Sequence, residues 1–218
     1  MNPAARYSRT AMLLHWLIAA ALAFQIGLGW RAERLAQSDS LYDVLQLHKS
    51  IGITILLLTL LRLAIRFFKP PPPALHDEKW AHFLARLTHV LLYAFMIGAP
   101  LTGWLLASSS RLEIDTILFG AVPWPHVPGV ETLAAEPKAT VHEISETAHE
   151  YLAWLGVALF AMHVAGAIRH QFLKSEPLLA RMLPVAAAHR KIAGSVVIAS
   201  LALLFGLTAV LTREVGLD

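Results

Sequence analysis

The sequence predicts an all-α integral membrane protein, and three features of the chain support that fold class. Of the 218 residues, 56% are hydrophobic and only 15% are charged, whereas a soluble domain is usually about 25% charged. Five apolar stretches each reach the roughly 20 residues that a helix needs to cross the hydrocarbon core of a bilayer. Eleven histidines stand in this apolar chain, and several of them fall inside the predicted spans.

The five predicted spans cover residues 11–30, 47–67, 83–106, 149–168 and 192–211. The run KPPPPALHDEKW separates the second span from the third, and it predicts a stiff turn because successive prolines cannot continue a helix. Residues 107–147 form the one long loop, whose centre VPWPHVPGVE is rich in proline and aromatic residues. The last part of that loop, TVHEISETAHE, predicts that the fourth helix begins outside the hydrocarbon.

The amino-terminal stretch has some features of a cleavable signal peptide. Arg6 and Arg9 precede the apolar run, and ALA at residues 21–23 resembles a cleavage site for signal peptidase. The apolar run nevertheless continues beyond that point to about Trp30. We therefore expect the first span to be retained.

Composition excludes several classes of function. The formal charge of +3 and the pI near 9.4 do not indicate a nucleic-acid partner, because in a multi-span protein the position of the charges matters more than their sum. The chain has no cysteine, which excludes disulfides, cysteine-ligated zinc, iron–sulfur clusters and haem attached through thioethers. We expect the lipid bilayer to be the main surrounding of the chain.

Basic residues predict the orientation of the spans through the positive-inside rule. With the amino terminus in the cytoplasm, the inner segments contain Arg6, Arg9, Arg62, Arg66, Lys69, Lys79, Arg86, Arg169, Lys174, Arg181, Arg190 and Lys191, out of 18 Lys and Arg residues. Only Asp77, Glu78 and Glu176 of the 15 acidic residues fall on that side. We therefore expect a bacterial inner-membrane protein with the long loop and the carboxyl terminus in the periplasm.

Four histidines pair by depth in this topology. His149 and His163 lie fourteen residues apart in the fourth span, a rise of about 21 Å, and they end only about 40° short of four full turns, on one helix face. His48 matches His149 at the outer level, and His15 matches His163 at the inner level. Two histidine pairs at two depths are what two stacked haems with bis-histidine ligation require, an arrangement that suits electron transfer.

Other interpretations of these histidines stay open at this point. A single histidine near the end of a span is usually an interfacial residue or part of a helix–helix hydrogen bond. Intramembrane ionisable residues also mark proton relays and divalent-metal sites, and a haem or metal permease is a further alternative. The five spans contain essentially no carboxylate, which argues against a metal transporter.

Further residues have weaker signals. Gly52, Gly166 and Ala19 follow the paired histidines by three or four residues and could let a porphyrin approach, although small residues also serve ordinary helix packing. His89 shares the inner level and could bind a propionate, line a quinone pocket or simply pack. We expect the remaining histidines to be solvated, namely His76, His82, His126, His142, His170 and His189.

Several motifs together resemble the bacterial cytochrome b561 family over roughly residues 5–185. They are RYSRTAMLLHW, LHKSIG, LTHVLLYAFMIGAPLTGW, HEYLAWLGVALFAMHVAGAIRHQF, and LLARMLP ending at Pro184. The resemblance implies a four-helix transmembrane bundle that encloses two b haems and exchanges electrons with ubiquinone. It implies axial ligands at His15, His48, His149 and His163, and a non-axial histidine at His89.

The resemblance leads to two hypotheses for function. In the favoured one, residues 1–185 form a di-haem cytochrome b domain that carries electrons between a periplasmic donor and the ubiquinone pool; at least some family members are superoxide oxidases. In the alternative, the chain is a haem-b anchor that passes electrons between a docked dehydrogenase or hydrogenase and quinone. Residues 186–218, with the fifth span and a short outer tail, depart from the family pattern. No catalytic residue is identified from the sequence.

Overall fold

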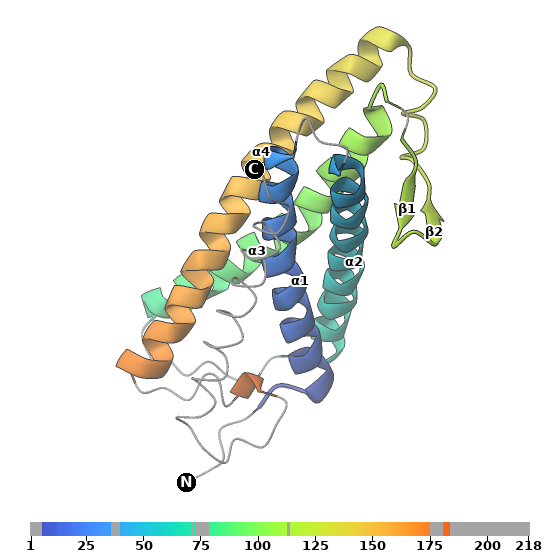
Figure 1. The fold of residues 1–218 in the computed structure, drawn as a ribbon. Coiled ribbons are helices and arrows are strands. Elements are labelled where there is room, and N and C mark those ends of the chain that lie inside the picture. Colours follow the sequence, from blue (N-terminus) through green and yellow to red (C-terminus); the bar gives the residue numbers. More distant parts are fainter. Residues whose placement is uncertain are drawn as a thin grey trace, which may run out of the picture.

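The computed structural model describes residues 6–35, 40–70, 72, 79–112, 114–174 and 181–183. The elements follow in the order α1 (Arg9–Arg34), α2 (Leu41–Phe68), α3 (Lys79–Ser109), β1 (Thr116–Leu118), β2 (Val122–Trp124), α4 (Ala135–Ile168) and a short π-helix η1 (Arg169–Leu173). The four α-helices run up and down as an elongated bundle, with the hairpin at one end (Figure 1). The predicted fifth span, residues 192–211, lies outside the described residues.

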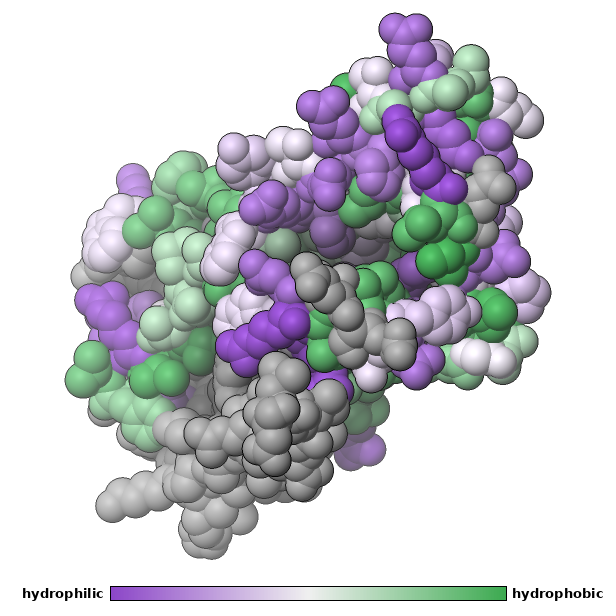
Figure 2. Space-filling model, turned by 45° about the horizontal axis from the view of Figure 1, so that its top comes forward, coloured by the Kyte–Doolittle hydropathy of each residue, from purple (hydrophilic) through white to green (hydrophobic). Residues whose placement is uncertain are grey.

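Four described helices are long and apolar enough to cross a membrane, and they correspond to the first four predicted spans. Many of their outward side chains are large and apolar, such as Leu57, Leu61, Phe67 and Phe68. Lipid can cover such surfaces, since the backbone polar groups of a helix are satisfied within the helix itself. In the space-filling view, hydrophilic residues are concentrated towards one end of the molecule (Figure 2).

Each helix extends beyond its predicted span, and α4 extends furthest. Its 34 residues correspond to about 51 Å at 1.5 Å per residue, well beyond the ~30 Å of hydrocarbon. The helix begins at Ala135, well before the predicted span at 149–168, so the stretch TVHEISETAHE is helical as predicted. The first turns of α4 therefore project beyond the bundle at the end that carries the hairpin (Figure 1).

Helix α1 begins at a capped end that also contacts the segment after η1. The Ser8 side chain accepts a hydrogen bond from the Ala11 N–H, the usual way to satisfy a free donor at a helix start. The Trp16 indole N–H donates to the Met182 carbonyl at 2.8 Å, and the Tyr7 N–H donates to the Arg181 carbonyl. Residues 181–183 thus lie against the inner end of α1.

The closest helix packing is between α3 and α4, between α1 and α2, and between α2 and α3. A buried cluster that includes Leu92, Phe95, Leu159 and Phe160 forms the centre of the bundle. Gly156 of α4 lies directly against the Phe95 ring, and a Cβ at this position would overlap the ring. Without a side chain at Gly156, α3 and α4 approach closely, the usual way to gain packing energy between membrane helices.

A β-hairpin in the long loop between α3 and α4 is an element that the sequence analysis does not predict, as is the short π-helix η1. β1 and β2 pair antiparallel with Ile117 opposite Pro123. The hairpin docks on α2, where the Ile117 N–H donates to the Gln46 side chain at 3.2 Å and the Phe119 N–H donates to the Ser50 hydroxyl at 2.9 Å. Gln46 and Ser50 lie four residues apart on one face of α2, so the hairpin covers the helix face opposite the one from which His48 projects.

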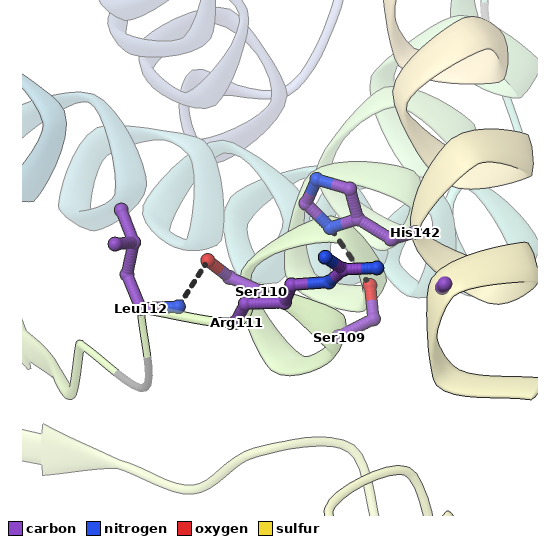
Figure 3. Close-up of a pocket in the computed structure, with 6 residues that line it drawn as sticks. Ser109, Ser110, Arg111, Leu112 and His142 are labelled. Carbon is purple, nitrogen blue, oxygen red and sulfur yellow. Dashed lines mark hydrogen bonds between the residues drawn. The ribbon is translucent and has the colours of Figure 1, made fainter. Parts of the chain in front are cut away.

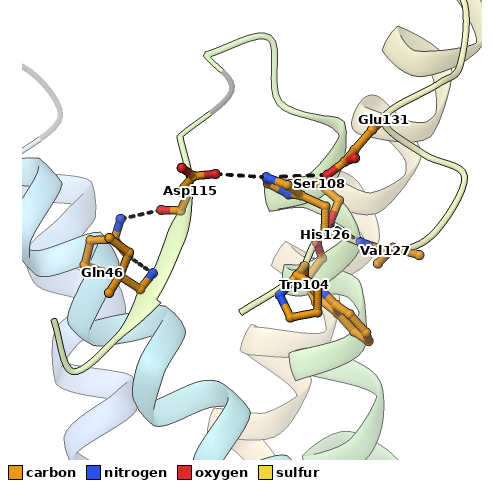
Figure 4. A network of polar contacts seen from close by, with 9 residues as sticks. Gln46, Trp104, Ser108, Asp115, His126, Val127 and Glu131 are labelled. Carbon is orange, nitrogen blue, oxygen red and sulfur yellow. Dashed lines mark hydrogen bonds and ion pairs between the residues drawn. The ribbon is translucent and has the colours of Figure 1, made fainter. Parts of the chain in front are cut away.

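The second half of the outer loop is tied to α3 (Figure 4). The Trp104 indole donates to the Pro125 carbonyl at 2.8 Å, and the Val127 N–H donates to the Ser108 hydroxyl at 2.9 Å. His126 Nε2 lies 3.8 Å from Asp115 and 4.0 Å from Glu131, and its side chain is only 18% exposed. The expectation that His126 is solvated is therefore wrong, because the loop folds back over it.

Candidate functional site

Two histidine layers lie in the bundle, and they are called inner and outer after the predicted orientation. The inner layer brings His15 of α1 to His163 of α4. Their ring centroids are 6.2 Å apart, with the ring planes at 71°. His89 of α3 joins them, its ring centroid 5.5 Å from that of His163. Three helices therefore present an imidazole at this level.

The outer layer brings His48 of α2 to His149 of α4. Their ring centroids are 6.1 Å apart, with the ring planes at 77°. The structure therefore brings together the two pairs that depth alone predicts, and α4 is common to both. Among the described residues, the backbone of α4 packs more closely against α3 than against α1 or α2.

The ring separations fit a metal held between two imidazoles. A metal–imidazole bond is about 2.0–2.1 Å long, so one ion between two opposed rings places their centroids about 6 to 6.5 Å apart. Both predicted pairs, at 6.1 and 6.2 Å, fall in this range. Within the part of the chain that the structure describes, no group of three or more His, Cys, Asp or Glu side chains is arranged to hold a metal ion. Two imidazoles are the axial ligands that haem iron takes in many b-type sites.

His149 is held in one orientation by α3. Its Nδ1–H donates to the Ala99 carbonyl at 2.9 Å, and the Thr102 hydroxyl lies 3.3 Å from the same nitrogen. A histidine that donates from Nδ1 keeps Nε2 unprotonated, and this is the usual arrangement of a metal ligand. Gly103 leaves room for the ring, since a Cβ there would lie 3.0 Å from Cε1 of His149.

His48 is fixed through its backbone more than through its ring. The Gln25 amide donates to the His48 carbonyl at 3.0 Å, and an added Cβ on Gly29 would lie 3.8 Å from Cε1 of the ring. Among the described atoms, Nδ1 of His48 and Oε1 of Gln25 are buried without a hydrogen-bond partner. Buried polar atoms normally have partners. These two atoms can therefore form hydrogen bonds to a group that is bound beside the outer pair.

His89 has the same local arrangement as His149. Its Nδ1–H donates to the Ala85 carbonyl of its own helix at 2.6 Å, which leaves Nε2 unprotonated. His163 therefore faces two imidazoles, His15 and His89. The His15–His163 separation of 6.2 Å matches one ion between two imidazoles, and the His89–His163 separation of 5.5 Å is shorter than that. This favours His15, whose axial role stays a prediction.

Arg62 is a component of the inner layer that sequence reasoning missed, because it was counted only as an inner positive charge. Its Nε–H donates to the Tyr93 hydroxyl, and its Nη1–H donates to the Ala11 carbonyl, both at 3.0 Å. The signal was available in the sequence, since Arg62 lies fourteen residues after His48, the same separation as between His149 and His163.

The small residues that lie against the histidine rings are not those expected to let a porphyrin approach, and that expectation stays a prediction. Gly52 faces the Gln25 amide, and Gly166 has no atom within 4 Å of an added Cβ. The glycines that lie against the histidine rings are Gly29 and Gly103, which come from neighbouring helices. The prediction considered only glycines on the same helix as each histidine, whereas the close contact is between helices.

The remaining described histidines lie outside the two layers. His82 is exposed as expected, whereas His142 and His170 are partly buried; His76 and His189 lie outside the described residues. His142 Nδ1 lies 3.4 Å from the Ser109 hydroxyl in an outer cavity of about 310 Å³ (Figure 3). The cavity is lined by Ser109, Ser110, Arg111, Leu112, Ala139 and His142.

Comparisons with known proteins place the chain among bacterial membrane cytochromes. A family model described as "Prokaryotic cytochrome b561" matches residues 6–185. "Cytochrome b561 homolog 2" of Escherichia coli (strain K12) is 30% identical over 184 residues, which cover 84% of this chain and 93% of that protein. "Cytochrome b561 homolog 1" of the same organism is 27% identical, covering 82% and 97%. "Probable superoxide oxidase CybB" of Yersinia pestis is 24% identical, covering 82% and 96%.

Proposed function

Because the chain belongs to the prokaryotic cytochrome b561 family, we propose that it carries electrons between a periplasmic donor and the ubiquinone pool. Family membership makes it a multi-pass protein of the bacterial inner membrane that takes part in electron transfer, and it implies haem b. The number of haems, the donor and the acceptor are the proposed part. We take superoxide as the donor.

The observation that carries the proposal is the pair of histidine layers on α4. We assign one haem b to His15 and His163 and a second to His48 and His149, because each pair has the separation that one iron between two imidazoles requires. Haem b with two axial histidines supplies one-electron oxidation and reduction without an open position for oxygen.

The chain's own groups hold and orient these ligands. The Ala99 carbonyl fixes His149 in the tautomer that presents Nε2, and Gly103 gives the ring its space. The helix backbone between His149 and His163 sets the distance between the layers at about 21 Å. Lipid and the buried cluster around Phe95 exclude water from the level between them.

Charge distribution supports an orientation with the amino terminus in the cytoplasm. Arg62, Arg66, Arg169 and Lys174 all lie on the side of the inner layer, and positive residues favour the cytoplasmic side. The outer pair, the hairpin and the projecting start of α4 then face the periplasm. On this orientation a fifth span at residues 192–211 returns the chain outward, so residues 186–218 form an addition to the 1–185 cytochrome domain.

Superoxide is favoured as the donor by one relative and by the outer surface. The Yersinia pestis relative is named as a probable superoxide oxidase. Arg111 lines the outer cavity beside Ser109 and His142 (Figure 3), and a cation at such a position attracts a small anion. In the balanced reaction, two superoxide anions each lose one electron to give O₂. One ubiquinone takes up the two electrons and two protons to give ubiquinol.

Stopped-flow spectroscopy of the purified full chain tests the proposal. Superoxide should reduce the bound haem within the mixing experiment, and an added short-chain ubiquinone should reoxidise it. An Arg111→Gln variant should slow only the first step. The matched control is Arg34→Gln, an exposed cation at the end of α1 that does not line the cavity, and it should leave that step unchanged. Failure of both steps, with reduction restored by a co-purified dehydrogenase, would instead support the anchor-subunit hypothesis.

A further inference from the structure

Arg62 is a charged residue within a membrane-spanning helix, and its side chain points into the bundle. It lies six residues before the end of α2 at Phe68, about 9 Å along the helix axis. A long cationic side chain near a helix end usually extends towards the headgroups. Arg62 instead donates to the Tyr93 hydroxyl on α3 and to the Ala11 carbonyl on α1, so two other helices hold its charge in place.

The position of Arg62 along α2 puts this charge in the inner layer. The fourteen residues between His48 and Arg62 match the fourteen between His149 and His163, so α2 and α4 advance by the same depth and nearly the same angle. In agreement, Arg62 lies within Coulombic range of His15, His163 and His89. Where the outer layer has the His48 imidazole on α2, the inner layer has a guanidinium.

The outer layer has a different electrostatic environment. The described surroundings of His48 and His149 provide a neighbouring imidazole and the Ala99 carbonyl. Lys49, next to His48 in the chain, interacts with Asp115 of the outer loop, and that carboxylate offsets its charge. A fixed cation, together with the charge of Arg66 one turn further along α2, therefore distinguishes the inner layer from the outer one.

A fixed cation changes the balance between the oxidised and reduced forms of a nearby iron centre. The oxidised form has one more positive charge than the reduced form, so a neighbouring cation disfavours it, and more strongly where water is excluded. Charge and burial around a haem are among the means by which a protein sets its reduction potential. An intramembrane charge is costly, and it usually marks a functional site.

We propose that Arg62 raises the reduction potential of the inner centre above that of the outer centre. This inference rests on the proposed function, in which each histidine layer holds one haem b. With a periplasmic donor, the difference makes electron transfer from the outer layer to the inner one favourable. In this proposal Arg62 acts on the inner centre through its charge and not through contact with the electron donor or acceptor.

Redox titration of the full chain, followed by optical and electron paramagnetic resonance spectra, tests the proposal. The inner centre is identified as the one lost in His15→Ala. Arg62→Gln should shift the reduction equilibrium of that centre about tenfold towards the oxidised form, which is about 59 mV for a one-electron couple. The outer centre should keep its midpoint. Arg66→Gln, four residues further along α2 at an exposed position, is the matched control and should shift the inner centre by less than half as much.

Two more variants separate charge from structure. Tyr93→Phe removes one hydrogen bond to Arg62 but keeps the charge, so its effect on the inner midpoint should be several-fold smaller than that of Arg62→Gln. Arg62→Lys keeps the charge, so it should hold the midpoint of the inner centre within about a threefold change in the equilibrium. If Arg62→Gln does not retain the inner haem, the midpoint of Arg62→Lys is the test in its place. A shift in Arg62→Lys as large as that expected for Arg62→Gln, or loss of the inner haem from both variants, would overturn the proposal.

The remaining outcomes are also decisive. An unchanged inner midpoint in Arg62→Gln, with both haems retained, would overturn this inference and leave the proposed function intact. Equal shifts of both centres would do the same, since they would show that Arg62 has no preference for the inner layer. A native protein with fewer than two haems per chain would instead refute the proposed function on which the inference rests.

Discussion

The inner and outer histidine layers have nearly the same ring separation, 6.2 and 6.1 Å, but they differ in what surrounds the rings. In the outer layer, a backbone carbonyl and a glycine of α3 fix His149, and the hairpin docks on the turn of α2 that carries His48, through Gln46 and Ser50. In the inner layer, Arg62 and the third imidazole of His89 stand beside the pair. The ligand pairs alone would make two equivalent centres, so any functional difference between them must come from these surroundings.

The two layers are also closed by different segments. The outer end is covered by a loop that hydrogen-bonds to Gln46 and Ser50 on α2 and to Ser108 on α3. The inner end is closed by residues 181–183, whose carbonyl groups accept hydrogen bonds from Trp16 and Tyr7 of the amino-terminal segment. A change at one end should therefore disturb one layer and leave the other in place.

The variant with the largest expected effect should destabilise both layers together, because it disturbs the contact between α3 and α4 that both layers share. A Cβ in Gly156→Ala would overlap the Phe95 ring, and overpacking of this kind costs about 3 kcal/mol. Thermal unfolding in detergent, followed by the haem absorption band, measures the loss of stability.

Gly166→Ala is the matched control on the same helix, where an added Cβ meets no atom within 4 Å. It should stabilise the helix by about 0.5–1 kcal/mol. Equal stability of the two variants would show that the α3–α4 contact is looser than described.

A smaller substitution should separate the layers. In Gly103→Ala, the new Cβ would lie 3.0 Å from Cε1 and 3.2 Å from Nδ1 of His149, so the ring must shift, at a cost of about 1–2 kcal/mol. The electron paramagnetic resonance signal of the outer centre should move, while that of the inner centre stays at its native position. Movement of both signals would contradict the independence of the two layers.

The smallest expected effect is the difference between variants of two residues on α2 with fully buried hydroxyls, Ser50 and Thr59. Ser50 accepts a hydrogen bond from Phe119 in the outer loop, so Ser50→Ala should cost about 1 kcal/mol and increase proteolytic cleavage within residues 116–124. Thr59 lies towards the inner layer, and its hydroxyl has no hydrogen-bond partner among the described atoms. Thr59→Val should therefore be close to neutral, because it removes an unsatisfied group. Protease sensitivity that rises equally in both variants would show that the hairpin does not depend on Ser50.

Much of the fold follows from the sequence because lipid imposes simple rules. Length and hydropathy are enough to locate α1 to α4, and the pairing of His15 with His163 and of His48 with His149 follows from helical rise and topology. Helix ends are less certain, because polar turns outside the bilayer, such as those at the start of α4, are not distinguished by hydropathy. Residues 192–211 stay a predicted span.

The features that the sequence analysis missed all depend on contacts between segments distant in the chain. The hairpin has strands of only three residues, one of them with Pro123 at its centre, and it is held in place by α2 rather than by its own propensity. The contacts of Gly103 with His149 and of Arg62 with Tyr93 join different helices, so no local pattern contains them. The distance between His48 and Arg62 was visible in the sequence, but only the structure shows that the Arg62 side chain turns inward.

Haem content per chain in single histidine variants, measured by pyridine haemochrome and reduced-minus-oxidised spectra, tests the two-layer arrangement most directly. The native protein should hold two b haems. His15→Ala and His163→Ala should lose one and the same centre, His48→Ala and His149→Ala should lose the other, and His89→Ala should retain both. Loss of the same centre in His15→Ala and His149→Ala would contradict the account. So would loss of the inner centre in His89→Ala together with its retention in His15→Ala.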